Sequence, residues 1–387
     1  MQSIAPIYLV AFFVVMGLSI IVPALPLYAR DLGASDIMIG ALIAGFGVAR
    51  VVFDIPAGIF AERMSEKKVL QIGLGIITVS SIGAALAPNY WLLLSARVFE
   101  GIGSALYVTT AATIVSASTE LGSRGRTMSY YTAAILVGTI VGPAVGGAVT
   151  PIWGKNSPFI VYAALAAISM LISHLTISNN QKPQRQKHEI DFGILFSDRS
   201  QLLISAATFA MAFMWTGLEL TVVPIFAYDN LNLSPISLGL VLTSAALANL
   251  FSTLIIGRLS DRLGRKAPMV FSYLVSAFAA ILLASSVNLE TFLLYALVYG
   301  LATGAWGQTS AWAADVGPKE RMGTVMGVNR MVGDLGFVIG PLALGYITGI
   351  RTGAYVEPYP FYVTAMIVLI VGILLVFARD PAKARVR

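Results

Sequence analysis

The sequence predicts an all-α integral membrane protein with twelve transmembrane helices in two pseudo-symmetric halves of six. The first observation is composition: 57% of the residues are hydrophobic and only 11% are charged, whereas an ordinary soluble domain carries roughly 25% charged residues. The second is that the apolar residues fall in blocks of about 20, the length that spans a hydrocarbon core. The third is that motifs of the first half return in the second half.

The apolar blocks divide into two sets of six, separated by one long polar segment. This segment, residues 179–201, is rich in Gln, Lys and Arg, and its stretch DFGILF could lie along the membrane surface. We therefore expect a six-helix bundle over 1–178, a linker, and a second bundle over 202–387. The predicted helices are 5–27, 38–60, 69–87, 90–113, 128–150, 158–177, 202–226, 236–258, 268–286, 290–313, 324–348 and 358–378.

The distribution of Lys and Arg predicts the orientation. Of these residues, nineteen lie in even-numbered loops and the C-terminal tail, three in odd-numbered loops and three inside helices. Basic loops stay in the cytoplasm. We expect a multi-pass protein of the cell membrane, with both termini and the linker cytoplasmic and with the first helix retained, because it lacks the flanks of a signal peptide.

Several classes of chemistry are disfavoured. The chain has no cysteine, which excludes disulfides, thiolate catalysis and Cys-ligated metals. His174 and His188 have no metal-ligand company, so we expect no metal and no cofactor. The sequence contains no cluster of nucleophile and base that would indicate an enzyme. It also contains no phosphate-binding loop that would indicate ATP as the energy source. The net charge of +6 follows from the basic loops, so we expect no nucleic-acid partner.

An internal repeat relates the two halves. Gly58, Glu62 and Arg63 return as Gly257, Asp261 and Arg262, and 257 − 58 = 199. Gly101 likewise returns as Gly300, and GTIVGP at 138–143 returns as GFVIGP at 336–341. An even number of helices per half makes the repeats parallel, with a solute site expected between them.

The repeated loops after helices 2 and 8 carry a Gly, an acid and basic residues. The acid could meet the positive N-terminal end of a facing helix and the arginine a carboxylate, which would brace one half against the other. The alternative is that both loops only anchor the topology. The candidate residues of the loop motif are Gly58, Glu62 and Arg63 in the first copy and Gly257, Asp261, Arg262, Gly264 and Arg265 in the second.

Three ionisable residues lie inside predicted helices 4 and 7. A charged Arg97 costs roughly 3 kcal/mol or more within a bilayer, so it needs a cavity or a partner, and Glu100 lies one turn away. Glu219 has no basic residue within a turn on its own helix, which makes it a candidate proton carrier. The alternatives are a neutral Arg97–Glu100 pair that only holds helix 4 and a hydrogen-bonded Glu219 that only packs.

Helix 5 carries glycines spaced four apart, which favour close helix packing, and a proline that favours a kink. They are Gly138, Gly142, Pro143, Gly146 and Gly147, echoed on helix 11 by Gly336, Gly340, Pro341 and Gly345. Aromatic and amide side chains are candidates for substrate lining, although for any one of them a position against lipid or another helix is the commoner outcome. These candidates are Trp215, Asn249, Tyr299, Trp306 and Gln308.

These motifs resemble those of the major facilitator superfamily. The second loop copy fits the family pattern G-x-x-x-D-R-x-G-R-[RK] throughout, while the first departs from it at Glu62, Ser65 and Glu66. The stretch around Arg97 is similar to the second family motif, and GTIVGPAVGG is similar to the antiporter signature. The opening VPALPLYARDLGAS, residues 22–35, also resembles the drug:proton antiporter branch.

The resemblance implies the major facilitator fold and a secondary transporter working by alternating access. Its partners would be protons, a small-molecule substrate and the lipid bilayer, and it would act as a monomer. We expect a proton-coupled antiporter that exports small lipophilic or amphipathic compounds. The alternative is a proton-coupled transporter of one metabolite, such as a sugar, a nucleoside or a lysolipid.

Two charge pairs suggest a cytoplasmic gate. Arg50 and Asp54 lie one turn apart on helix 2, and Arg330 and Asp334 one turn apart on helix 11. The implied fold places these helices side by side and antiparallel. Opposite charges then match at two levels about 6 Å apart. The alternative is that each pair neutralises itself within its own helix.

Overall fold

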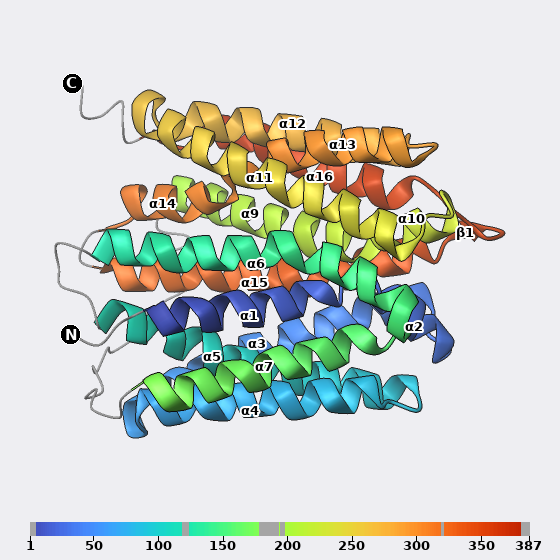
Figure 1. Ribbon diagram of the computed structural model, residues 1–387. Coiled ribbons are helices and arrows are strands. Elements are labelled where there is room, and N and C mark those ends of the chain that lie inside the picture. The colour runs from blue at the N-terminus through green and yellow to red at the C-terminus, as the bar shows by residue number, and fades with distance from the viewer. Residues whose placement is uncertain (1–4, 118–123, 178–192, 194–197, 319–320, 381–387) are drawn as a thin grey trace. The chain divides into compact units, whose positions relative to one another are not determined.

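The structure of the protein is a computed structural model that describes residues 5–117, 124–177, 193, 198–318 and 321–380 (Figure 1). Among these residues, eleven helices are long and apolar enough to cross a membrane, and the number is twelve if the bent pair near the N-terminus forms one span. The predicted all-α membrane fold is confirmed. The surface stretch DFGILF lies, except for Gly193, outside the described residues.

In the first half, most helices begin and end within a few residues of their predicted limits. They are α1 (Ala5–Ile20), α2 (Leu25–Asp31), α3 (Asp36–Arg63), α4 (Glu66–Ala85), α5 (Tyr90–Ala117), α6 (Arg124–Trp153) and α7 (Ser157–Thr176).

The first predicted helix is broken. Instead of one helix over 5–27, α1 and α2 meet at a bend of 51°. Pro23 lies in the break and Pro26 in the first turn of α2. Because proline lacks a backbone N–H and its ring clashes with the preceding turn, two prolines three residues apart prevent a continuous helix.

In the second half, two spans are irregular and a short hairpin joins the last two. The elements are α9 (Arg199–Phe213), the π-helix η1 (Met214–Val222), α10 (Val223–Asp229), α11 (Pro235–Leu263), α12 (Lys266–Ala284), α13 (Leu289–Ala302), the 3₁₀ turn η2 (Thr303–Ala305), α14 (Trp306–Val316), α15 (Met322–Thr348), β1 (Arg351–Thr352), β2 (Tyr355–Val356), α16 (Tyr359–Leu374) and η4 (Leu375–Phe377).

A proline accounts for where the π-helix ends. Pro224 is the second residue after η1, which ends at Val222, and it cannot donate a hydrogen bond to the carbonyl one turn earlier. The N–H of Val223 bonds to the carbonyl of Leu218, five residues back. This wider spacing is the π pattern, which occurs mostly as short segments and often at functional sites.

The chain forms two compact units. The first comprises residues 1–186 with 234–243, and the second comprises residues 187–233 with 244–387. In the first unit α1 packs against α6 and α7, and α4 packs against α5 and α7. In the second unit α15 packs against α9 and η1, and α12 packs against α13 and α16. Large apolar side chains such as Val79, Trp91 and Phe271 remain about 70% exposed, as expected of a lipid-facing surface.

The glycine motif of α6 faces α1 within the first unit. A Cβ atom on Gly138 would lie 2.7 Å from the carbonyl oxygen of Phe12, and one on Gly142 would lie 2.8 Å from that of Met16. Gly146 meets the carbonyl of Ile20 still more closely. No side chain fits at these positions without displacing backbone.

The same contact recurs in the second unit. A Cβ atom on Gly340 of α15 would lie 2.6 Å from the carbonyl oxygen of Phe213, and Gly336 meets the carbonyl of Phe209. Gly217 of η1 lies against the backbone of Gly340. The sequence repeat is therefore also a repeat of packing.

We predict that leucine at Gly142 or Gly146 forces α6 away from α1. Overpacked sites cost about 1–3 kcal/mol, so the free energy of unfolding should fall by roughly that amount. Proton leak through reconstituted protein should rise, because the displaced helices no longer exclude water. The control is Gly83→Leu on α4, since a Cβ atom on Gly83 would meet no neighbour within 4 Å. Wild-type proton leak and transport in both variants, with only stability lowered, would show that the motif is only local packing.

Candidate transport site

The second unit brings Glu219 together with two aromatic side chains. Glu219 lies in the middle of η1 and is partly exposed, and its neighbours within the unit are the hydroxyl of Tyr299 and the indole of Trp215. Tyr299 comes from α13 and is only 3% exposed. Its hydroxyl makes no hydrogen bond of ordinary geometry. The carboxylate therefore has polar neighbours but no cation among these contacts.

A cluster of aromatic rings lies beside Glu219. The rings of Trp215 and Trp306 lie 4.9 Å apart between centroids, and Phe337 meets Trp215 edge-on at 5.9 Å. These residues come from η1, α14 and α15. Such tilted ring contacts are favourable and present flat apolar faces. Three of the helices of this unit thus contribute to one aromatic cluster beside Glu219.

The helix that carries Tyr299 and leads to Trp306 is interrupted at η2, and side chains satisfy its displaced backbone. Ser252 donates to the carbonyl of Leu301, and Ser272 donates to that of Ala302. The Asn249 amide donates to the hydroxyl of Thr303 at 2.9 Å. Irregular backbone within a membrane protein requires such partners. Asn249, predicted as substrate lining, therefore already holds an intramolecular bond, and the lining role stays a prediction.

Arg97 and Glu100 form a buried ion pair in the first unit. Arg97 is 4% exposed and Glu100 is fully buried, and the two side chains are in direct contact. Ser81 donates to the other carboxylate oxygen at 2.8 Å, and the guanidinium lies 4.9 Å from the ring centre of Phe46. The pair is electrically neutral. The alternative interpretation, in which the pair only holds helix 4 in place, requires the same neutrality.

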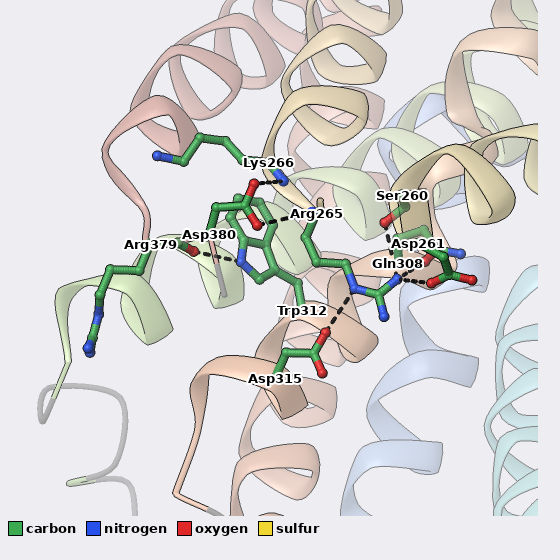
Figure 2. A network of polar contacts seen from close by, with 9 residues as sticks. All are labelled: Ser260, Asp261, Arg265, Lys266, Gln308, Trp312, Asp315, Arg379 and Asp380. Carbon is green, nitrogen blue, oxygen red and sulfur yellow. Dashed lines mark hydrogen bonds and ion pairs between the residues drawn. The ribbon is translucent and has the colours of Figure 1, made fainter. Parts of the chain in front are cut away.

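The second copy of the loop motif centres on Arg265, whose partners lie in its own unit (Figure 2). Its guanidinium bonds to Asp315 of α14 and to Asp261, both at 2.8 Å. It also donates to Ser260 at 3.1 Å and to Gln308 at 3.3 Å. Partial burial opposes the charge, but the carboxylates of Asp315 and Asp261 outweigh it and raise the pKa of Arg265. Gln308, a predicted lining residue, belongs to this network.

The first copy is described less fully. Its helix α3 ends at Arg63, and the side chains of Glu62 and Arg63, like Gly58, lie outside the described part of the structure. Ser65 caps α4. The brace between halves stays a prediction for both copies.

The predicted gate residues occupy two helices in different units. On α15, Arg330 Nε lies 3.8 Å from Asp334 Oδ2, a loose contact within one helix. On α3, Arg50 and Asp54 are partly buried. The contact on α15 agrees with the self-paired alternative for that helix, and the gate itself stays a prediction.

Sequence reasoning missed the partners of Arg265. Asp315 lies 50 residues from it, and Asp380, which contacts its backbone, lies 115 residues away. Neither belongs to a recognisable motif, so no sequence signal pointed to them. The π-helix around Glu219 was also not predicted, although Pro224 gave a partial signal.

The chain matches the model of the Major Facilitator Superfamily over residues 7–222 and 204–387. An MFS-type transporter of Methanocaldococcus jannaschii is 25% identical over 96% of this chain and 97% of its own length. The quinolone resistance protein NorA of Staphylococcus aureus is 22% identical, covering 100% and 98%. Multidrug resistance protein 2 of Bacillus subtilis is 26% identical, covering 94% and 91%.

Solved structures agree on the fold. A bacterial homologue of the human lysosomal transporter Spinster superposes with a TM-score of 0.83 at 17% identity, covering 97% of this chain and 96% of the other. The nucleoside transporter NupG gives 0.82 at 14% identity, covering 97% and 98%. With two six-helix repeats, the loop and glycine motifs and a family match along nearly its whole length, the chain belongs to the Major Facilitator Superfamily, a family of transporters and not of enzymes.

Proposed function

We propose that this protein is a proton-coupled antiporter that exports small lipophilic or amphipathic compounds across the cell membrane by alternating access. The observation that carries the proposal is the setting of Glu219 in the π-helix, beside an aromatic cluster and without a cationic neighbour among its described contacts. The similarity to a quinolone resistance protein and to a multidrug resistance protein supports the proposal.

Glu100 and Glu219 differ in what they can do with a proton. Glu100 is already neutralised by Arg97 and bonded by Ser81, so a proton there would leave a buried cation unpaired. Glu219 has the uncharged Tyr299 and Trp215 beside it. Taking up a proton there removes a charge from an apolar setting instead of creating one. Glu219 is therefore the proposed proton carrier, with Arg97 and Glu100 setting the electrostatics.

The same carboxylate can exchange a proton for a substrate. Flat rings of Trp215, Trp306 and Phe337 offer apolar and cation–π contact. A lipophilic cation bound there and a proton on Glu219 would exclude one another by charge, and this competition is the basis of antiport. A hydrophilic metabolite would need several free hydrogen-bonding groups, whereas Asn249 and Thr303 bond to each other. This contact favours the lipophilic substrate over the metabolite alternative.

The remaining parts of the proposal concern placement. The excess of Lys and Arg in alternate loops supports cytoplasmic termini. Both six-helix repeats lie in one chain, so a single copy supplies both sides of an alternating-access path, which supports action as a monomer.

Replacing Glu219 by Gln should abolish transport driven by a pH gradient and leave substrate counterflow, because Gln keeps the size of Glu but cannot ionise. The measurement uses purified protein in liposomes and a panel of lipophilic cations and metabolites. Glu290→Gln, at an exposed glutamate of α13, serves as control. Gradient-driven uptake at the wild-type rate in Glu219→Gln would sink the assignment of the proton carrier.

Replacing Trp306 by Leu should raise the KM for a lipophilic cation by roughly tenfold, the loss expected for one desolvated cation–π contact. The effect on a neutral lipophilic substrate should be smaller, because only apolar contact is lost. Trp91→Leu changes an equally large but lipid-exposed ring and should leave KM unchanged. An unchanged KM for Trp306→Leu would place the substrate away from this cluster.

The gate is tested by charge exchange. If Arg50 and Asp54 pair with Asp334 and Arg330 in the closed cytoplasmic state, then Asp54→Arg or Arg330→Asp alone should impair transport. The double variant should recover a substantial part of it, since opposite charges again face each other. Because the chain has no cysteine, introduced single cysteines can report cytoplasmic accessibility. Without recovery, and with unchanged accessibility, only pairing within each helix remains.

A further inference from the structure

The helix α12 begins without a capping side chain of its own. Its N-cap position is Arg265, with helical dihedral angles and no side-chain cap bond. The corresponding helix of the first half, α4, is capped by Ser65, whose hydroxyl accepts from the N–H of Lys68 at 3.4 Å. The repeat offset puts Gly264 in the place of Ser65, since 65 + 199 = 264. The second half has thus replaced a capping residue by one without a side chain.

Asp380, which follows the last helical turn of the second half, supplies the missing acceptor (Figure 2). Its two carboxylate oxygens accept from the backbone N–H groups of Arg265 and Lys266, at 3.3 Å and 3.4 Å. The first N–H groups of a helix have no partner within it, and the helix dipole favours a negative charge there. Asp380 therefore does for α12 what Ser65 does for α4.

Gly264 is required for this contact. A Cβ atom built on Gly264 would lie 2.9 Å from Asp380 Oδ1 and 3.0 Å from Asp380 Cγ. The residue also has φ +91°, which favours glycine. The carboxylate of Asp380 occupies the space that a side chain at position 264 would need.

The segment that carries Asp380 is fastened on both sides. The indole of Trp312, a fully buried residue of α14, donates to the carbonyl of Arg379 at 2.9 Å. The N–H of Arg379 donates to the hydroxyl of Ser200 at 2.9 Å, and its guanidinium pairs with Asp198. Asp380 is consequently held in place by α14 and by the start of α9.

We propose that Asp380 is a positioning residue for the loop motif: by capping α12 it fixes the backbone of Arg265 and so seats the Arg265 guanidinium on Asp315. The positioning of the Arg265 guanidinium against Asp315 rests on these contacts alone. The effect of this positioning on transport rests on the function proposed above, in which this loop moves with its bundle during alternating access. Loss of Asp380 should free Arg265 and slow the conformational cycle without changing the substrate site, which lies at Glu219.

The seating can be measured without transport. Ser260 is 1% exposed and its hydroxyl accepts from Arg265, so Ser260→Cys places a thiol directly under the guanidinium. No other cysteine is present. The rate at which a water-soluble maleimide labels this thiol in purified protein in nanodiscs reports how often Arg265 leaves its place.

We expect Asp380→Ala to raise the labelling rate roughly fivefold, the factor that loss of one N-cap carries. Asp380→Asn should raise it less, because its oxygen still accepts although the charge is lost, and it serves where the alanine variant folds poorly. Glu290→Ala, an exposed acid of the same unit, should leave the rate unchanged. Equal labelling of the Ser260→Cys protein with and without Asp380→Ala would overturn the proposal.

Gly264→Ala gives an independent test. It displaces Asp380 sterically, so it should raise labelling by itself, and adding Asp380→Ala should then change little further. Full additivity of the two substitutions would contradict the shared contact. In liposomes, Asp380→Ala should lower the maximal transport rate and leave KM unchanged. Faster labelling with an unchanged maximal rate would overturn the link to transport, whereas a lack of transport in the unsubstituted protein would instead refute the proposed function.

Discussion

Backbone contact between α15 and the α9–η1 segment determines where the candidate site lies. Gly340 packs against Phe213, and Gly217 packs in turn against Gly340. Because glycine brings two helix backbones together without a flexible side chain between them, η1 has little freedom to slide along α15. Glu219 lies two residues beyond Gly217, so its position is set by this contact and not by its own weak polar neighbours.

The two halves use the same packing for different purposes. In the first unit the glycines of α6 pack against α1, and Glu100, a buried acid of that unit, is paired with Arg97. In the second unit the corresponding glycines fix a π-helix whose acid has no cation among its described contacts. The two repeated bundles thus place an ion-paired acid in one half and, in the other, an acid with no cation among its described contacts. The proposed proton coupling would depend on this difference between the halves.

The fold was largely predictable because the membrane imposes one rule on every span. Blocks of about 20 apolar residues must be helical, since backbone groups find no partner in lipid. The deviations came from contacts that hydropathy does not register. Pro23 and Pro26 break the first span, and Pro224 ends the π-helix, because each removes a donor from the helix. Glu219, Trp215, Tyr299 and Trp306 were identified by their charge or ring, whereas Phe337 was not. Their grouping was not predicted either, since Glu219 and Tyr299 are 80 positions apart (299 − 219 = 80). The cap of α12 shows the limit most clearly: a motif match identified Gly264 and Arg265, and only the structure revealed Asp380.

The distance along the chain between α12 and its cap has a consequence for biosynthesis. Helix α4 carries its cap in the preceding residue, Ser65, so that end of the first bundle can close as soon as the helix leaves the ribosome. The start of α12 must wait until Asp380, 115 residues after Arg265, has been translated. At about 5–20 residues per second, that interval lasts on the order of ten seconds. During this time the backbone N–H groups at the start of α12 lack their acceptor, and the backbone of Arg265 lacks the contact that fixes it.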